Sequence, residues 1–256
     1  MHSASVGFHC PGCTSSASTH VVTGATLFRA APASAPVTAV LVGLNVAVHL
    51  AGLVLTGRGS EDLLLRGGLI GDAVVRTADG VQQIGVAHGE WWRIVTSGFL
   101  HVGLFHLLMN CLLAWRIGCE FERNLGRVRF GLLYLASLLG GSLGVLVFAP
   151  DQLSVGASGA VFGLFGAVVA ADLSQGRNPW HSQVGPLLAI NLVLTFVIPR
   201  ISIGGHLGGL IAGFAAGVML FGLPGSRRGL TSATMAMSFL GLFSAGLFAA
   251  SIALGH

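Results

Sequence analysis

The sequence predicts an all-α polytopic membrane protein, and two observations carry this prediction. Of the 256 residues, 53% are hydrophobic and only 9% are charged, whereas a soluble domain carries about 25% charged residues. Long apolar runs alternate with short polar stretches along most of the chain, as in proteins that cross a bilayer several times. The net charge of +4 is small and its arginines lie between the runs, so it predicts topology rather than nucleic acid binding.

Seven apolar segments are expected to form membrane-spanning helices. They are Val37–Leu55, Leu104–Ile117, Phe130–Phe148, Ala157–Ala171, Gly185–Ile198, His206–Leu223 and Leu230–Leu254. Several are shorter than the ~20 residues that cross a typical bilayer, so we expect their flanks to extend the helices.

The arginines predict the orientation. They gather in the stretch 116–129 after the second segment, which we expect to be a loop, at Arg177 after the fourth, and at 227–228 after the sixth. The positive-inside rule places these connections in the cytoplasm, together with a flexible N-terminal tail over residues 1–36. The long first loop, 56–98, and the starts of the second, fourth and sixth segments then face outward.

The N-terminal stretch HCPGC contains one C-x-x-C pair, Cys10 and Cys13. With His2, His9 or His20 as further ligands, this pair could form half of a zinc site. A structural zinc site uses four good ligands, and a second cysteine pair is missing. A tail without bound metal is therefore the favoured interpretation.

Glycines recur at three- and four-residue steps in the fourth and sixth segments. They are Gly156, Gly159, Gly163 and Gly166 in the fourth, and Gly204, Gly205, Gly208, Gly209 and Gly213 in the sixth. Small residues at such steps let helix backbones approach closely in lipid, which predicts tight packing of these two helices. Gly156 and Gly159 are also expected to leave room for a substrate backbone.

Polar side chains lie near the outer ends of the even-numbered segments: His101, His106 and Asn110 at the second, Ser158 at the fourth and His206 at the sixth. Polar residues within membrane spans are costly and usually functional. A serine hydroxyl is a weak nucleophile that needs an adjacent base, normally histidine. Ser158 and His206 therefore suggest nucleophilic catalysis, with unpaired N–H groups at a helix start available to hold an oxyanion.

Other roles are open for each residue taken alone. Ser158 could be a small packing residue, and His206 a proton relay or a hydrogen-bonded core residue. His101, His106 and His206 could bind a metal ion, because imidazole is a common ligand, and Asn110 could bridge helices. A transporter would carry polar residues at midplane and internal repeats, neither of which is clear here. The convergence of the polar groups favours catalysis.

The same residues resemble the motifs of the rhomboid intramembrane serine proteases. The matching stretches are GASG at 156–159, HVGLFHLLMN at 101–110, GGHLGGLIAG at 204–213, WWRIVTSGFLH with Trp92 and Arg93, and FERNLG with Glu122 and Gly126. The resemblance covers about Trp91 to Gly222 together with the first apolar segment. Five motifs in the family's order make it specific.

The resemblance implies a rhomboid-like six-helix bundle over 37–223, followed by a linker and one additional C-terminal transmembrane helix within 224–256. It implies that Ser158 is the nucleophile and His206 its general base. The Ser158 backbone N–H would form the oxyanion hole with the side chains of Asn110 and His106.

The remaining implied site residues support this dyad: His101 in the neighbouring polar network, Gly156 in the nucleophile motif, and Phe162 as the aromatic that stacks on the histidine. No metal and no organic cofactor is implied. The expected partners are transmembrane-helix protein substrates within the lipid bilayer, with the oligomeric state left open. The expected location is a bacterial inner membrane with an outward-facing site. A non-catalytic relative that binds transmembrane helices is the alternative.

Overall fold

The computed structural model describes most of the chain between the first and sixth apolar segments. The described residues are 2–3, 8–9, 35–55, 61–77, 80–182 and 184–222. Cys10, Cys13, His20 and the expected seventh span, Leu230–Leu254, lie outside the described residues, so the predictions made for them stay predictions.

The chain divides into two compact units, Met1–Ala31 and Pro32–His256. In the first unit, strand β1 (His2–Ser3) pairs antiparallel with β2 (Phe8–His9). The second unit contains all the elements that follow.

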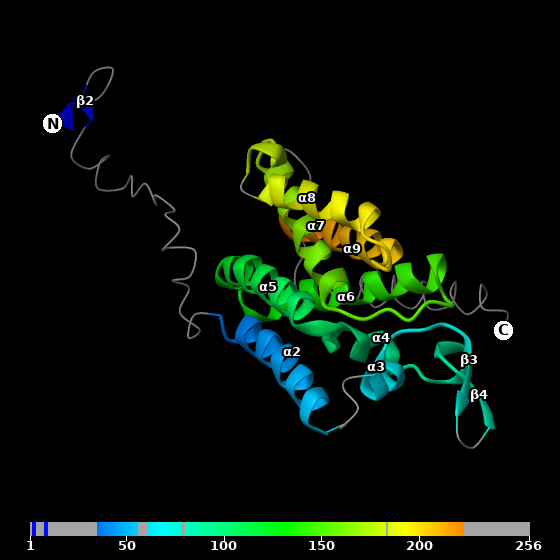
Figure 1. Ribbon diagram of the computed structural model, residues 1–256. Coiled ribbons are helices and arrows are strands. Elements are labelled where there is room, and N and C mark those ends of the chain that lie inside the picture. The colour runs from blue at the N-terminus through cyan, green and yellow to red at the C-terminus, as the bar shows by residue number, and fades with distance from the viewer. Residues whose placement is uncertain are drawn as a thin grey trace. The chain divides into compact units, whose positions relative to one another are not determined.

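Six apolar helices of the second unit coincide with the first six predicted segments (Figure 1). They are α2 (Pro36–Leu55), α5 (Gly103–Leu125), α6 (Arg127–Phe148), α7 (Ser158–Ser174), α8 (Val184–Val197) and α9 (Ile203–Phe221). Helices α2, α5, α6 and α9 are long and apolar enough to cross a membrane, whereas α7 and α8 are shorter. The prediction of a helical polytopic protein is confirmed.

The long connection between α2 and α5 is folded rather than extended. Its elements are α3 (Glu61–Gly67), β3 (Ala73–Thr77), β4 (Gly80–Ile84), the 3₁₀ helix η2 (Val86–His88), α4 (Arg93–Thr96) and the 3₁₀ helix η3 (Ser97–Phe99). Strands β3 and β4 form an antiparallel hairpin in which Ala73 pairs with Ile84 and Thr77 with Gly80. A further 3₁₀ helix, η4 (Pro179–His181), lies between α7 and α8.

The predicted loop over 116–129 is wrong. Helix α5 continues to Leu125 and α6 begins at Arg127, so Gly126 alone separates them. Gly126 has a φ of 80°, a conformation that glycine adopts without steric cost. The prediction failed because charge was used to end the helix. Glu and Arg are good helix formers, so the helix continues after its apolar part ends.

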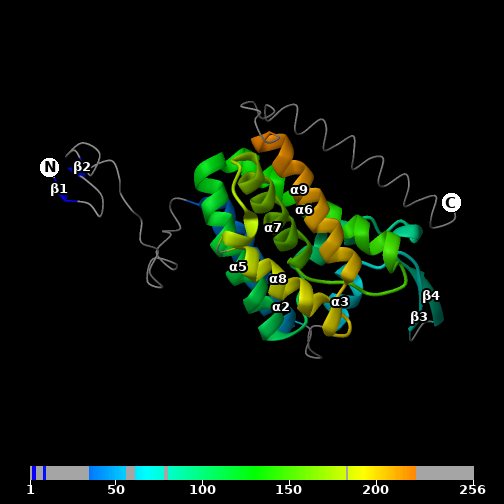
Figure 2. The same cartoon turned by 90° about the horizontal axis from the view of Figure 1, so that it is seen from above.

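Helix α7 contacts α5, α6, α8 and α9 (Figure 2). The predicted close packing with α9 is confirmed, because a Cβ atom added at Gly209 or Gly213 would overlap the α7 backbone at Gly159 or Gly163. A Cβ atom at Gly159 would lie 3.3 Å from the Cα of Gly141 on α6. Gly159 therefore faces neighbouring helices, and the expectation that it leaves room for a substrate is wrong.

A buried carboxylate fixes the start of α2 against α5. Pro36 has no N–H group, and the next two N–H groups donate to Glu122: Val37 N to Oε1 at 2.9 Å and Thr38 N to Oε2 at 2.7 Å. The Thr38 hydroxyl donates to the same Oε2 at 2.8 Å. These bonds satisfy donors that a helix start leaves unpaired, and the negative charge complements the helix dipole.

Replacing this carboxylate tests its contribution. Glu122→Gln removes one acceptor oxygen and turns an amide N–H group toward the donors of α2. We expect the free energy of unfolding, measured by SDS titration of the detergent-solubilised protein, to fall by about 1–3 kcal/mol. Glu120→Gln is the matched control, because the Glu120 side chain is 59% exposed and pairs with Arg123, a surface pair worth at most about 1 kcal/mol. An equal loss of unfolding free energy in Glu122→Gln and Glu120→Gln would contradict the role of Glu122 in capping α2.

Candidate active site

The segment that leads into α7 is held by the folded connection between α2 and α5. Leu69 and Ser154 exchange two backbone hydrogen bonds, of 2.9 and 2.8 Å. Two residues later, the Gly156 N–H donates to the Ser97 carbonyl at 2.9 Å. These bonds hold the chain at two positions just before the helix begins, so elements outside α7 help to fix the position of Ser158.

Gly156 occupies a position that only glycine fits. Its φ is 126°, and a Cβ atom there would lie 2.7 Å from Cε1 and 2.8 Å from Nε2 of His106. The His106 ring therefore fills the space that a side chain at this position would need, and the expected role of Gly156 beside a substrate stays a prediction. A Cβ atom at Gly156 would also lie 3.6 Å from the Ser158 hydroxyl oxygen. The absence of a side chain at Gly156 therefore lets the His106 ring lie close to the serine.

Ser158 is the first residue of α7 and is half-buried. The first N–H groups of a helix have no partner within it, which agrees with the expected oxyanion site at this end. Within the part of the chain that the structure describes, the Ser158 hydroxyl forms no hydrogen bond. The hydroxyl is therefore not committed to the backbone.

His206 lies in the first turn of α9 and is buried. Its ring stacks on Phe162 with centroids 4.0 Å apart and an interplanar angle of 18°. Phe162 comes four residues after Ser158, so both lie on one face of α7. The stacking brings the imidazole to the helix face that starts with the serine. The Nδ1 atom of His206 lies 2.7 Å from the hydroxyl of Thr195 on α8.

The remaining predicted residues, His101, His106 and Asn110, come from α5 and the segment just before it. The His101 ring is buried, lies 5.0 Å from the His106 ring, and accepts the Ala157 N–H at Nε2 at 3.3 Å. Burial, with a smaller contribution from His106, lowers the pKa of His101 to about 3, so it is neutral at pH 7. Asn110 Nδ2 donates to the His106 carbonyl at 2.9 Å, which uses one of its two hydrogens.

These contacts link most of the sequence-predicted residues, which come from residues 101–106 and from the starts of α7 and α9, whereas the hydrogen bond of Asn110 goes to the His106 carbonyl. His106 and Gly156 are adjacent, His101 binds the residue before Ser158, and Phe162 joins α7 to His206. Among the described residues, no group of three or more His, Cys, Asp or Glu side chains is arranged to hold a metal ion.

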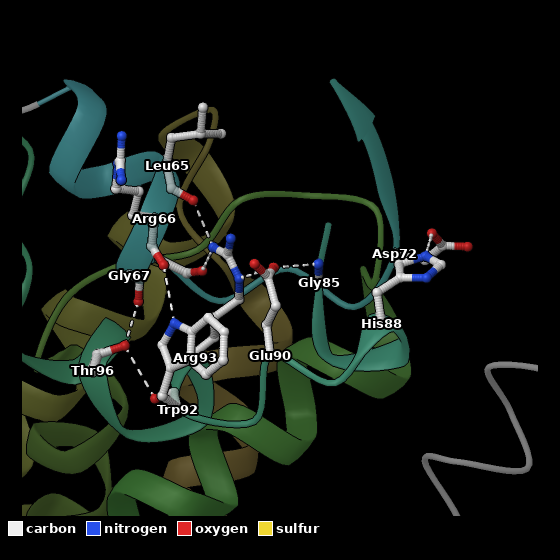
Figure 3. Close-up of polar contacts among 11 residues, drawn as sticks. Leu65, Arg66, Gly67, Asp72, Gly85, His88, Glu90, Trp92, Arg93 and Thr96 are labelled. Atoms are coloured by element: carbon white, nitrogen blue, oxygen red, sulfur yellow. Dashed lines mark hydrogen bonds and ion pairs between the residues drawn. The ribbon is translucent and has the colours of Figure 1, made fainter. Parts of the chain in front are cut away.

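Sequence reasoning missed the network around Arg93, shown in Figure 3. Only 2% of the Arg93 side chain is exposed. Its Nη1 group donates to the carbonyls of Leu65 at 2.6 Å and Gly68 at 2.7 Å, and its Nε donates to Glu90 at 2.7 Å. Burial alone would raise the pKa of Glu90, but hydrogen bonds from Arg93 and the Gly85 N–H, with the arginine charge, lower it. The carbonyl partners carry no signal in the sequence.

Sequence reasoning also passed over Thr195, although a signal for it existed. It is one of two polar residues, with Asn191, in the predicted segment Gly185–Ile198. Polar side chains in such segments usually face a partner. The partner of Thr195 could not be predicted from the sequence, because His206 lies next to Thr195 only when α8 and α9 pack together.

Comparison with known proteins places most of this chain in one family. The Rhomboid domain matches residues 88–223, more than half of the 256 residues. Rhomboid protease GluP of Bacillus subtilis (strain 168) is 43% identical over 143 residues, which are 54% of this chain and 28% of that protein.

Two further relatives give similar values. YdcA of the same bacterium is 41% identical over 135 residues, 51% of this chain and 68% of that protein. RHOMBOID-like protein 4 of Arabidopsis thaliana is 35% identical over 175 residues, 66% of this chain and 41% of that protein. The chain thus spans less than half the length of GluP and of RHOMBOID-like protein 4.

The Arg93 network predicts a measurable effect on the connection that holds the Ser158 segment. Arg93→Met keeps the apolar volume but leaves two carbonyls without the arginine donor and leaves Glu90 with only the Gly85 N–H. We expect a loss of about 3 kcal/mol of local stability, as for other broken buried ion pairs, seen as faster hydrogen–deuterium exchange at Gly68 and Gly85. Arg66→Met is the control, because Arg66 is 77% exposed in its pair with Asp62. Unchanged hydrogen–deuterium exchange at Gly68 and Gly85 in Arg93→Met would show that Arg93 does not stabilise this connection.

Proposed function

Because this chain belongs to the rhomboid family and is an integral membrane protein, we propose that it is an intramembrane serine endopeptidase. It hydrolyses peptide bonds within or next to the transmembrane segments of other membrane proteins. Ser158 is the nucleophile and His206 the general base in this proposal. The observation that carries it is the stack of His206 on Phe162, one turn after a serine with an uncommitted hydroxyl.

The chemistry needs only side chains and backbone groups of this chain. As Ser158 Oγ attacks the scissile carbonyl carbon, its proton moves to Nε2 of His206. The resulting oxyanion accepts hydrogen bonds from the Ser158 N–H, the second Nδ2 hydrogen of Asn110 and the ring of His106. Collapse of this intermediate breaks the C–N bond, and His206 gives the proton to the leaving amine.

The second half of the reaction removes the acyl group. Water attacks the ester carbonyl, His206 takes a proton from the water, and the proton returns to Ser158 as the acid product leaves. The hydrogen bond between Ser158 and His206 that this requires forms in the substrate complex, since such bonds are often long or poorly aligned without substrate.

The proposed substrate must expose a peptide bond to the serine. A peptide in a transmembrane helix hides its carbonyls in hydrogen bonds to residue i+4, so it must unwind locally before attack. Small or helix-breaking residues near the cut lower that cost. The distribution of arginines supports an N-terminus in the cytoplasm and a site toward the outer side of the membrane. The proposed location is a bacterial inner membrane.

A non-catalytic relative that binds transmembrane helices is the alternative. It would not need a reactive serine, so chemical labelling separates the two. A fluorophosphonate probe reacts with a serine hydroxyl only when that hydroxyl is activated.

We expect a fluorophosphonate probe to label Ser158 in the detergent-solubilised protein, as read by mass spectrometry. Ser158→Ala should abolish labelling and cleavage of single-span model substrates while leaving thermal unfolding unchanged, and His206→Ala should abolish both activities because the base is lost. Ser174→Ala, at the other end of α7, is the control and should label as the wild type does. Cleavage that persists in Ser158→Ala would end the proposal.

The role of Asn110 is tested separately. Asn110→Ala removes a proposed donor to the oxyanion together with the bond from Asn110 Nδ2 to the His106 carbonyl. Because the oxyanion forms only in the transition state, we expect the turnover number to fall by roughly 10²–10³ with the KM little changed. Asn124→Ala is the matched control: its amide also donates to the carbonyl four residues earlier on α5, at 2.9 Å, but it is exposed at the opposite end. If the turnover number of Asn110→Ala falls no further than that of Asn124→Ala, the role of Asn110 is structural and not catalytic.

A further inference from the structure

Helix α8 turns one polar side chain toward the site. Its buried residues are Gly185, Leu188 and Thr195, while apolar side chains such as Val193, 59% exposed, point away. Only 1% of Thr195 is exposed. Burying a hydroxyl in an apolar setting is unfavourable unless it finds a hydrogen-bond partner, so the partners of Thr195 explain its orientation.

Thr195 has two such partners at the same distance. Its Oγ1 lies 2.7 Å from the Asn191 carbonyl oxygen and 2.7 Å from Nδ1 of His206. A hydroxyl has one proton, and a carbonyl oxygen can only accept. Both contacts are hydrogen bonds only if Thr195 donates to Asn191 and accepts from a protonated Nδ1 of His206. The opposite arrangement would satisfy one contact and lose the other.

We propose that Thr195 is a positioning residue that holds His206 in the tautomer with hydrogen on Nδ1. Neutral imidazole then has its lone pair on Nε2, the atom that must accept the serine proton. This inference rests on the proposed function, because it explains how the proposed base is kept ready.

Thr195 and Phe162 act on different degrees of freedom of the imidazole. The stack with Phe162 fixes the plane of the ring, and the bond to Thr195 fixes which edge of the ring faces α8. In triad enzymes a buried carboxylate bonded to Nδ1 selects the tautomer. Here a neutral hydroxyl supplies the same orientation without placing another charge in the membrane, where charge is costly.

The tautomer is measured directly by ¹⁵N NMR of histidine-labelled full chain in detergent, with the His206 signal assigned by its absence in His206→Ala. We expect a protonated Nδ1 and an unprotonated Nε2 in the wild type, and a mixture of tautomers in Thr195→Val. Thr195→Ser should restore the wild-type pattern. A protonated Nε2 in the wild type, or an unchanged pattern in Thr195→Val, would overturn the inference whether or not the protein cleaves peptides.

Kinetics give the second readout. We expect Thr195→Val to lower the turnover number and the rate of fluorophosphonate labelling about 5- to 10-fold, the effect of one neutral hydrogen bond, with the KM unchanged. Thr195→Ser should recover most of the loss. Val193→Thr is the matched control because it adds a hydroxyl to the exposed face of α8, and it should behave as the wild type.

The two proposals fail differently. Wild-type rates in Thr195→Val, with labelling of Ser158 intact, would overturn the role of Thr195 and leave the protease proposal standing. A wild type that neither labels nor cleaves would overturn the protease proposal, and the NMR tautomer would still decide whether Thr195 orients His206. If Thr195→Ser is as slow as Thr195→Val, the result would also contradict the proposal that the hydroxyl of residue 195 orients His206.

Discussion

The close contact between α7 and α9 is the constraint on which the rest of the structure depends. Glycines at 163, 209 and 213 let the two backbones approach to a distance that a side chain at any of these positions would prevent. Lipid offers no hydrophobic force between helices, so such contact and its van der Waals energy must hold them together. Ser158 begins α7, and His206 lies in the first turn of α9. The same contact therefore brings the helix end that carries the serine and the helix end that carries the histidine together.

The connection between α2 and α5 supplies what helix packing alone does not. The segment before α7 has an extended course, and it is fixed by backbone bonds to Leu69 and Ser97. That connection is in turn held by the buried Arg93. Gly156 then carries the chain past His106 with a backbone conformation that other residues rarely adopt. The buried arginine, which belongs to the connection and not to α7 or α9, thus helps to set the geometry around the serine.

Features with a local cause could be predicted from the sequence. Apolar composition located six helices, and glycine spacing predicted which two pack closely, because both depend on residues within one segment. The helix end at Leu125 was missed because hydrophobicity marks the apolar part of a helix and not its end. Gly159 was misread, because whether a glycine faces a substrate or a helix depends on tertiary packing. Thr195 and the carbonyl partners of Arg93 were missed for the same reason, because their contacts join different elements that meet only in the folded protein.

The most direct test is an experimental structure of the protein after reaction with a fluorophosphonate. We expect the phosphorus atom to be bonded to Ser158 Oγ, with Nε2 of His206 within about 2.6–3.2 Å of an oxygen of the adduct or of the serine. An adduct on another residue, or a His206 ring that points away from Ser158, would contradict a catalytic pair formed where α7 and α9 meet.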